Sequence, residues 1–398
     1  MNRNIGTACS ITTGKLDANQ AVKGGRYPFF TCAEYPDTID RFAFDGDVVL
    51  VAGNNAKGNF HVSRFNGKFN AYQRTYVLRA KDGFDIDYIY YALKLELKRL
   101  REKSQGSQTK FLTMPILNGI HVRSLSFEEQ SAIASALKTI DAKIDCNNRI
   151  NAELEAMAKT LYDYWFVQFN FPDANGTPYK SSGGKMVYNP TIKREIPAGW
   201  SPCELSEIIS RSATGLNPRD NFKLGHGENY YVTIKNVSNG KIVLNDKCDR
   251  IDDETLDIID RRSQLQPGDV LFTSIEPVGV TYLIQDKPIN WNINESVFTI
   301  RPNYNKVSSE FLFALLSSSE MKVFTKNSSS GSIHKGIRHG VLKTFKLAYG
   351  DKTLIDRFST ATIPILKRID VIDKENQHLT NLRDWLLPML MNGQVTVA

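Results

Sequence analysis

Two stretches of the chain repeat apolar residues at alternating steps of four and three positions. They cover residues 128–166 and 358–390. This spacing places the apolar side chains on one face of an α-helix and is typical of a coiled-coil seam. Because each helix alone would expose an apolar stripe, we expect the two to pack against each other. Pro364 and Pro388 are expected to limit or kink the second helix.

Three polar residues interrupt these seams, at Asn147, Asn151 and Asn376. An asparagine in such a seam weakens the apolar core and can fix the register of the two helices, although it is also often a tolerated defect. The positions that we assign to helix pairing and partner contact are Ile133, Leu137, Ile140, Ile144, Asn151, Leu154, Leu161, Ile365, Ile369, Ile372, Asn376, Leu379 and Leu386.

Alternating and β-branched residues precede each long helix and predict strands. The strands are expected at residues 47–52, 72–79, 269–274 and 296–301. A short helix follows in each half, at residues 87–101 and 308–326, and ends in a loop rich in Gly and Ser. Each half of the chain is therefore predicted to be a β-rich block closed by helices.

The two blocks are related by an internal repeat. FDGDVV at residues 44–49 recurs as QPGDVL at residues 266–271, and NAYQRTYVLR at 70–79 recurs as NINESVFTIR at 292–301, both at a spacing of 222 residues. From QGSQTK at 105–110, which matches SGSIHK at 330–335, the spacing is 225 residues. Thr13-Gly14 recurs as Thr214-Gly215 at the shorter spacing of 201 residues. The second half therefore has some twenty extra residues, which we place around residues 239–262.

These patterns predict an α+β fold with two β-rich domains related by internal repeat and separated by a long antiparallel two-helix coiled coil. The length of 398 residues also exceeds the size at which a single core stops growing. The expected divisions are a first β-rich domain at 1–125, a central long helix at 126–168, a linker at 169–200, a second β-rich domain at 201–350 and a C-terminal long helix at 351–398.

The composition is that of a soluble globular protein, with 41% hydrophobic and 23% charged residues. No apolar run approaches the roughly eighteen residues that a membrane helix needs, and the first residues lack the apolar core of a signal peptide. We therefore expect a cytoplasmic protein with no membrane role. The five cysteines are too scattered for a zinc site or a disulfide framework, which favours ordinary thiols.

Positive charge is concentrated in the first block. Residues 1–125 contain 18 Lys and Arg against 11 Asp and Glu, whereas residues 126–168 contain 4 against 7. A basic domain followed by an acidic helix suits a polyanion-binding domain attached to a protein-binding helix. An uneven solvated surface explains the charge equally well.

The sequence offers no catalytic or cofactor-binding motif. GNNAKGN at residues 53–59 has the glycine spacing of a phosphate-binding loop but lacks its lysine, and we interpret it as a turn. Glu96-Leu97-Lys98 matches half of a nuclease site but lies in a helical stretch among basic residues. The histidines have no metal-ligand spacing on a helix. We expect no catalytic residue, no cofactor and no metal.

Several segments resemble the specificity subunit of type I restriction-modification systems. They are the Gly-Asp-Val strand, the Gly-Ser loop, the Glu-Glu-Gln helix start at residues 128–130, LYDYWFVQFNFPDANGTPYKSSGG at 161–184 and IPAGW at 196–200. The resemblance covers nearly the whole chain. The first half departs from the pattern, because little precedes Ile11 and it has no IPxGW of its own. Whether the C-terminal end of the chain completes it stays open.

The resemblance implies a non-catalytic subunit that reads a bipartite target in double-stranded DNA. Each β-rich domain would be a target-recognition domain for one half of the site. The helices would hold two methyltransferase subunits and, through them, the restriction subunits. Catalysis and S-adenosylmethionine would belong to those partners. The half-site separation would follow from the rigid helices between the two domains.

Loop residues supply the candidate DNA contacts, because cations neutralise phosphates while amides, hydroxyls and carboxylates match donors and acceptors in the grooves. For phosphates we choose Lys15, Lys57, Lys110, Arg219, Lys326, Lys335 and Arg338. For base edges we choose Asn54, Asn55, Gln105, Gln108, Ser274, Glu276, Ser332 and His334. The alternative for each is a solvated loop residue.

Two other classes of protein remain. A stand-alone DNA-modifying enzyme, either a nuclease or a methyltransferase, would need metal-binding acids or a cofactor loop, which we do not find. A scaffold protein with two helical arms would need no basic β-rich domain. The sequence predicts neither the DNA sequence that is recognised nor the length of its spacer.

Overall fold

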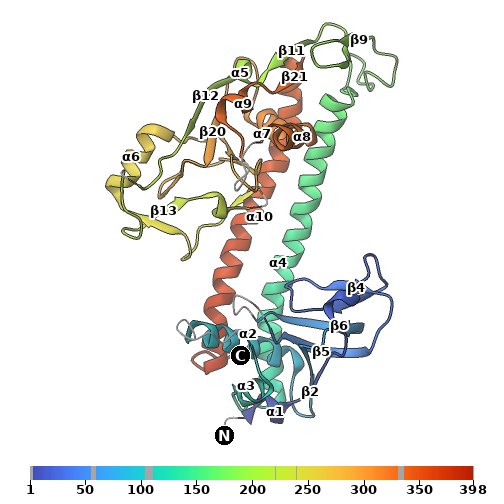
Figure 1. Cartoon of the computed structure of the whole chain (residues 1–398), viewed down its shortest axis with the longest axis vertical. Helices are drawn as coiled ribbons and strands as arrows, with labels where there is room; N and C mark the ends of the chain where they lie inside the picture. Colours follow the sequence, from blue (N-terminus) through green and yellow to red (C-terminus); the bar gives the residue numbers. More distant parts are fainter. Residues whose placement is uncertain are drawn as a thin grey trace. The chain divides into compact units, whose positions relative to one another are not determined.

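The computed structural model describes residues 3–54, 60–103, 111–219, 221–238, 240–329 and 336–397 (Figure 1). The fold is mixed α+β, and the chain divides into two compact units. The first unit combines Met1–Asn148 with Lys374–Ala398, and the second is Arg149–Asp373. This division cuts both long helices, α4 (Phe127–Tyr162) and α10 (Lys352–Asn392), whereas the sequence placed the domain boundaries near helix ends.

A six-stranded sheet forms the body of the first unit. Its strand order is β2-β7-β5-β6-β3-β4, in which only β3 and β6 pair in parallel. Along β5, Val49 and Val51 join one core, whereas Val48 and Leu50 point to the other face and join a second core. The strands are β2 (Cys9–Thr13), β3 (Tyr27–Phe30), β4 (Asp37–Ile39), β5 (Phe44–Ala52), β6 (Val62–Ala71) and β7 (Thr75–Ala80).

Helices complete the first unit. Tyr88 of α2 (Ile86–Lys103), Leu137 of α4 and Leu390 of α10 are buried in one core. The C-terminal turns of α10 therefore complete the N-terminal unit, which answers the question that its short beginning left open. The smaller elements of this unit are β1 (Arg3–Asn4), α1 (Ile5–Ala8), η1 (Ala18–Gln20), α3 (Met114–Gly119) and β8 (His121–Val122).

The second unit has the same order of strands in two smaller sheets. One has the order β12-β20-β17-β18, and the other has the order β16-β13-β19 with β13 and β19 in parallel, as β3 and β6 are. The strands are β12 (Ile209–Thr214), β13 (Asn229–Val232), β16 (Asp249–Ile251), β17 (Val270–Thr273), β18 (Thr281–Leu283), β19 (Trp291–Ile293) and β20 (Val297–Pro302).

Additional elements lie between β13 and β17 of the second unit. They are η3 (Ile234–Asn236), β14 (Val237–Ser238), β15 (Lys241–Ile242) and α6 (Asp253–Ser263). In the described part of the first unit, the matching stretch between β3 and β5 contains β4 and no helix. These elements occupy the region in which the spacing of the repeated motifs predicted extra residues.

The repeated Gly-Asp-Val segment has a structural reason in each unit. Gly46 and Gly268 have φ angles of 118° and 90°, in the left-handed region that favours glycine. The aspartate that follows is ion-paired in both units. Arg64 Nη2 donates to Asp47 at 2.8 Å, and Arg301 Nε donates at 2.7 Å to Asp269, which is buried.

Two helical predictions need correction. The single helix expected at residues 308–326 is two helices, α7 (Ser309–Ser317) and α8 (Ser319–Ser328). Ser318 between them has an extended backbone, and its hydroxyl caps α8 by accepting from the Met321 amide at 3.1 Å. In contrast, α10 continues through both Pro364 and Pro388, although each proline removes one backbone donor.

The segment predicted as a linker, residues 169–200, forms part of the hydrophobic core of the second unit. Phe169 is 1% exposed, and the ring of Phe171 stacks on Trp200 at 5.3 Å between centroids. Its aromatic residues therefore pack as core residues. The elements around it are a π-helical turn (Asp163–Val167), β9 (Met186–Asn189), β10 (Arg194–Pro197), β11 (Ser201–Glu204), α5 (Leu205–Ile208), α9 (His339–Lys343) and β21 (Lys346–Tyr349).

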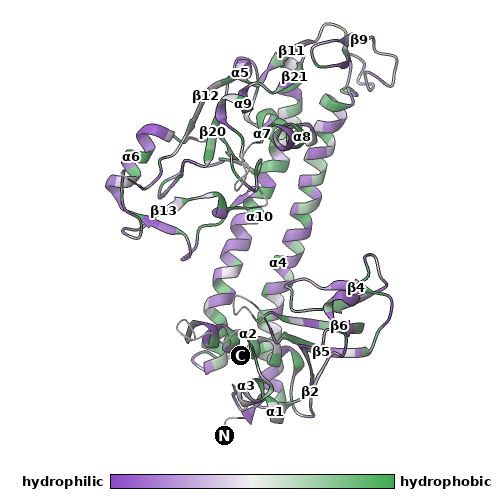
Figure 2. Cartoon of the chain, in the orientation of Figure 1, coloured by the Kyte–Doolittle hydropathy of each residue, from purple (hydrophilic) through white to green (hydrophobic). Residues whose placement is uncertain are grey.

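Within each unit, the segments of α4 and α10 run antiparallel, and hydrophobic and hydrophilic residues are interspersed along both (Figure 2). The contacts of the first unit join Asp141 to Arg383 and Asn147 to Asn376, so residue numbers rise along one helix as they fall along the other. The corresponding contacts of the second unit join Asn151 to Asp373 and Tyr162 to Phe358.

The seam residues differ in burial. Ile133, Leu137, Asn151 and Ile372 are buried. Ile140, Ile144, Leu154, Leu161, Ile365, Ile369, Asn376, Leu379 and Leu386 are half-buried. The asparagines pair with polar groups, since Asn147 Nδ2 donates to both Asn376 and Glu375 at 2.9 Å.

Among the described residues, no helix is both long enough and apolar enough to span a membrane. The same residues contain no cluster of His, Cys, Asp and Glu that could hold a metal ion.

Candidate nucleic-acid interface

In the first unit, the residues that flank two segments with predicted DNA contacts, 55–59 and 104–110, pair with each other. Asn54, after β5, forms a β-bridge with Phe111, and the amide of Leu112 donates to the carbonyl of Gly53 at 2.9 Å. Asn54 and Phe111, the described residues that flank segments 55–59 and 104–110, are therefore adjacent. The predicted contacts within these segments lie outside the described residues, namely Asn55, Lys57, Gln105, Gln108 and Lys110.

A cleft of about 450 Å³ lies beside this junction. Thr13, Arg74 and Phe111 contribute to its lining. Phe111 is 51% exposed, and the guanidinium of Arg74 lies 5.7 Å from the centre of its ring. Lys15 is exposed and follows β2 by two residues. An exposed cation over an exposed aromatic ring suits contact with phosphate and with a base.

Arg74 is not among the DNA contacts that the sequence predicts. It lies in the turn between β6 and β7, and the sequence signal was available in the repeated segment NAYQRTYVLR. The segment was interpreted as a strand from residue 72, which hid the turn at its centre. The carbonyl of Arg74 accepts from the amide of Gly53 at 2.8 Å, so this turn is fixed next to the junction of the two loops.

The glycine of the repeated Thr-Gly pair lies very close to a neighbouring backbone in each unit. A Cβ atom on Gly14 would lie 2.0 Å from the carbonyl oxygen of Ala71, and one on Gly215 would lie 1.6 Å from that of Ile293. Both glycines therefore allow a close approach of two backbones, and any larger residue would have to move a strand.

The second unit repeats the junction of loops. Ile275, after β17, forms a β-bridge with Gly336, and the amide of Ile337 donates to the carbonyl of Ser274 at 2.8 Å. In both units, therefore, a residue just after the Gly-Asp-Val strand pairs with the first described residue after the Gly-Ser segment. The predicted contacts Ser332, His334 and Lys335 lie outside the described residues.

The remaining predicted contacts of the second unit differ in their environments. Glu276 and Arg338 are exposed on the two sides of the junction, while Arg219 and Lys326 are exposed in the loop after β12 and in the last turn of α8. Ser274 is 6% exposed, and its hydroxyl donates to the carbonyl of Ser296 at 2.8 Å. That hydroxyl is already bonded within the fold rather than directed at solvent.

Further basic residues near β12 were not selected from the sequence. Arg211 Nη2 donates to the carbonyl of Arg262 at 2.7 Å, and Arg262 Nη2 donates to the Thr214 hydroxyl at 3.2 Å. His339 packs against Phe298 and is hydrogen-bonded to the hydroxyl of Ser212. Burial, assisted by the charge of Lys343, lowers the pKa of His339, which favours the neutral imidazole.

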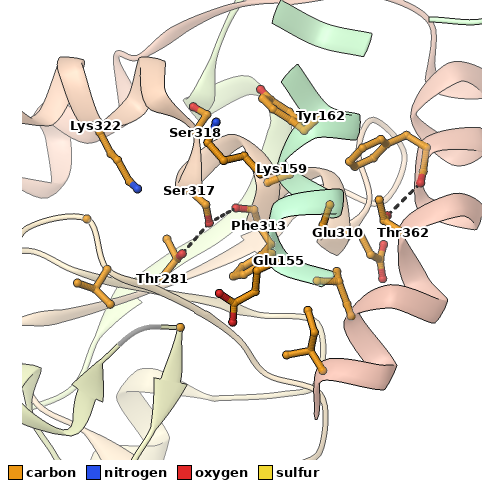
Figure 3. Close-up of a pocket in the computed structure, with 18 of the residues that line it drawn as sticks. Glu155, Lys159, Tyr162, Thr281, Glu310, Phe313, Ser317, Ser318, Lys322 and Thr362 are labelled. Atoms are coloured by element: carbon orange, nitrogen blue, oxygen red, sulfur yellow. Dashed lines mark hydrogen bonds between the residues drawn. The ribbon is translucent and has the colours of Figure 1, made fainter. Parts of the chain in front are cut away.

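A cavity of about 450 Å³ also lies in the second unit, between α4, α7 and α10 (Figure 3). The hydroxyls of Thr281 and Ser317 are 2.7 Å apart at its edge. Ala158 lines it, whereas the matching seam residue of the first unit is Arg383, which donates to Asp141 at 2.9 Å. None of the predicted DNA contacts that the structure describes lines this cavity.

Comparisons with known proteins find similar DNA-specificity domains and subunits. Residues 1–156 match the type I restriction modification DNA specificity domain. The chain is 31% identical over 230 residues to the EcoDI specificity subunit of Escherichia coli, covering 54% of this chain and 50% of that protein. It is also 22% identical over 320 residues to the MjaIX specificity subunit of Methanocaldococcus jannaschii, covering 80% of this chain and 71% of that protein.

The aligned part thus spans about half the length of the Escherichia coli relative. A crystal structure of the type I restriction-modification S subunit from M. genitalium shares the fold, with a TM-score of 0.61 and 17% identity over 98% of this chain and 96% of that one. Residues 1–156 are thus similar to the type I restriction modification DNA specificity domain, and the chain shares its fold with the S subunit from M. genitalium.

Proposed function

We propose that this chain is the DNA-specificity subunit of a type I restriction-modification complex and has no catalytic activity of its own. Each unit would read one half of a bipartite target in double-stranded DNA. The observation that carries the proposal is the repeated pairing of a residue after the Gly-Asp-Val strand with a residue that follows the Gly-Ser segment, Asn54 with Phe111 and Ile275 with Gly336.

The repeated strand order supports two reading domains of common origin. Matching sequence motifs lie on matching strands in the two units. The strand orders are β2-β7-β5-β6-β3-β4 in the first unit and β12-β20-β17-β18 with β16-β13-β19 in the second. Loops on a rigid sheet are the usual carriers of recognition residues. Two such domains in one chain would give two half-sites, and the antiparallel helices would act as a coiled-coil spacer between them.

The helices also carry apolar side chains that are exposed. Trp385 is 54% exposed and Leu382 is 44% exposed on α10, and Met157 is 56% exposed on α4. Exposed apolar groups of this size favour contact with another protein, and tryptophan is frequent among residues that dominate binding energy. We propose that two methyltransferase subunits bind along α4 and α10 and that the restriction subunits join the complex through them.

A domain exchange tests the proposed function. Residues 1–125 would be replaced by the equivalent domain of a relative, and methylated adenines would be mapped across the genome of a host that carries the complex. One half of the recognised sequence should change while the other half stays the same. The unmodified complex is the control, and the purified chain alone should methylate and cleave nothing in the presence of Mg²⁺ and S-adenosylmethionine.

Two results would contradict the proposal. If both halves of the target changed together, the chain would not contain two independent readers. If the isolated chain modified DNA, it would be a stand-alone enzyme, which is the alternative that the sequence left open.

A further inference from the structure

Within the second unit, one carboxylate joins the hairpin β14–β15 to both long helices. The Nζ atom of Lys241 lies 2.5 Å from Oδ1 of Asp373 on α10. The same oxygen accepts a hydrogen bond from Nδ2 of Asn151 on α4 at 2.6 Å. Lys241, from the β-rich part of the unit, thus contacts the same carboxylate that joins α4 to α10.

The hairpin is itself part of the core of that β-rich domain. Val237, in β14, is 2% exposed and packs in one cluster with Leu271 of β17 and Ile293 of β19. Ile242, next to Lys241, packs against the same cluster. Because the hairpin does not move independently of the sheet, the position of Lys241 on the helices also fixes the position of the sheet on them.

The surroundings make this contact stronger than an ordinary surface ion pair. The side chains of Lys241 and Asp373 are 32% and 24% exposed, so water screens their charges only in part. Burial raises the pKa of Asp373, and the hydrogen bond and charge of Lys241 oppose that rise. Burial likewise raises the pKa of Glu155, and the charge of Lys241 opposes that rise. Without Lys241, both carboxylates would lose a compensating charge.

Among the described residues, this contact has no equivalent in the first half of the chain. Lys241 lies in the extra segment between β13 and β17, and the described stretch between β3 and β5 contains no matching hairpin. The seam position that matches Asp373 in the first half is Asn148, whose Oδ1 accepts from Asn376 at 3.0 Å. A neutral amide pair therefore replaces the ion pair there, and it links only the two helices.

We propose that Lys241 is a positioning residue that fixes the second recognition domain on α4 and α10 and thereby selects the length of the DNA spacer between the two half-sites. The proposal rests on the proposed function as a two-part reader. Each added base pair moves a half-site by about 3.4 Å and turns it by about 34°. A domain held at one angle accepts one spacer, whereas a domain that can tilt accepts its neighbours.

The test uses the complete complex with its methyltransferase subunits. Methylation rates would be measured on the natural target and on targets whose spacer is one base pair longer or shorter, for the original protein and for K241Q. We expect the preference for the natural spacer to fall about threefold to fivefold in K241Q, as loss of a partly buried ion pair implies. The half-site sequences that are recognised should not change.

Two further variants keep the test decisive. K247Q alters an exposed lysine of the same extra segment and should leave spacer preference unchanged. The charge exchange K241D/D373K should restore the preference, because the free Oδ1 of Asn151 has no partner among the described residues and can accept from a lysine at position 373. Restoration would also show that the loss in K241Q did not result from misfolding.

The outcomes separate this inference from the proposed function. Equal spacer preference in K241Q and the original protein would overturn the positioning role while leaving the two-part reader intact. If the original complex methylated targets without regard to a second half-site, the proposed function itself would fail, whatever the variants did.

Discussion

At the scale of single residues, the pair Arg74 and Phe111 is an exposed candidate for DNA contact in the first unit. Phe111 presents half of its surface to solvent under the guanidinium of Arg74. Changing Arg74 to Ala should weaken DNA binding and make the dependence of log affinity on log salt shallower by about one unit, because one phosphate contact is lost.

The matched control is Arg74→Lys, which keeps the charge but loses the planar group that stacks on the ring. It should retain the salt dependence and still lose affinity. Titration of the assembled complex at several salt concentrations measures both quantities. An unchanged salt slope in Arg74→Ala would remove Arg74 from the interface.

The half-buried imidazole of His339 predicts a pH effect on the second unit. Its pKa is lowered, first by burial and then by the charge of Lys343, so the fold favours the neutral form. As pH falls below about 6.5, the unfolded chain takes up a proton that the folded chain resists. Stability contributed by this residue is therefore complete at neutral pH and decreases as pH falls toward the lowered pKa.

Thermal unfolding of the original protein and of His339→Gln, compared between pH 7.5 and pH 5.5, would measure this contribution. Gln keeps a hydrogen-bonding group near Ser212 but does not titrate. The original protein should lose more stability on acidification than the variant. Equal losses would mean that His339 is equally protonated in the folded and unfolded states.

At the scale of elements, the seam of the long helices predicts the effect of charge on assembly. Ile144 of α4 and Ile369 of α10 are half-buried in the seam. Replacing both with Asp would place unpaired carboxylates there, at a cost of about 2 kcal/mol or more in total. The double variant should lose its methyltransferase subunits and bipartite methylation, whereas Lys110→Ala or Lys335→Ala should assemble normally and bind DNA more weakly.

Size-exclusion chromatography of the co-expressed complex would detect the loss of assembly. A double-Asp variant that still eluted with its methyltransferase subunits would show that these helices are not paired as proposed.

The sequence predicted those elements whose pattern is local and missed those that depend on tertiary packing. The strand expected at residues 47–52 is present within β5, because its buried run alternates between two cores. The break between α7 and α8 depends on one capping hydroxyl in a run of serines, which leaves the helical pattern of apolar residues almost unchanged. Periodicity alone could not detect it.

Packing partners explain the other differences. The segment 169–200 has the Gly, Pro and Asn content of a linker, and its aromatic residues become core only because α7 and α10 supply Phe311 and Phe358 in the same cluster. The sequence placed candidate DNA contacts in the correct kinds of loop, yet the Ser274 hydroxyl bonds to a carbonyl of the next strand. A partner 22 residues away cannot be deduced from a loop composition.

At the scale of the whole molecule, the two units are built from the chain in different ways. The second unit is one continuous segment, whereas the first takes its residues from both ends of the sequence. Leu390 and Met391 belong to the core in which Tyr88 and Leu137 are buried. The core of the first unit therefore depends on residues from near the C-terminal end of α10.

Because of this arrangement, the order in which the two units fold is expected to be the reverse of the order in which their first residues are synthesised. A ribosome releases the chain from its N-terminus at about 5–20 residues per second, and domains fold as their residues emerge. Residues 149–373 can close their core as soon as they have emerged, while the earlier strands must wait for the last turns of α10. The first unit is thus completed after the second, and until then its apolar core is incomplete in the cell.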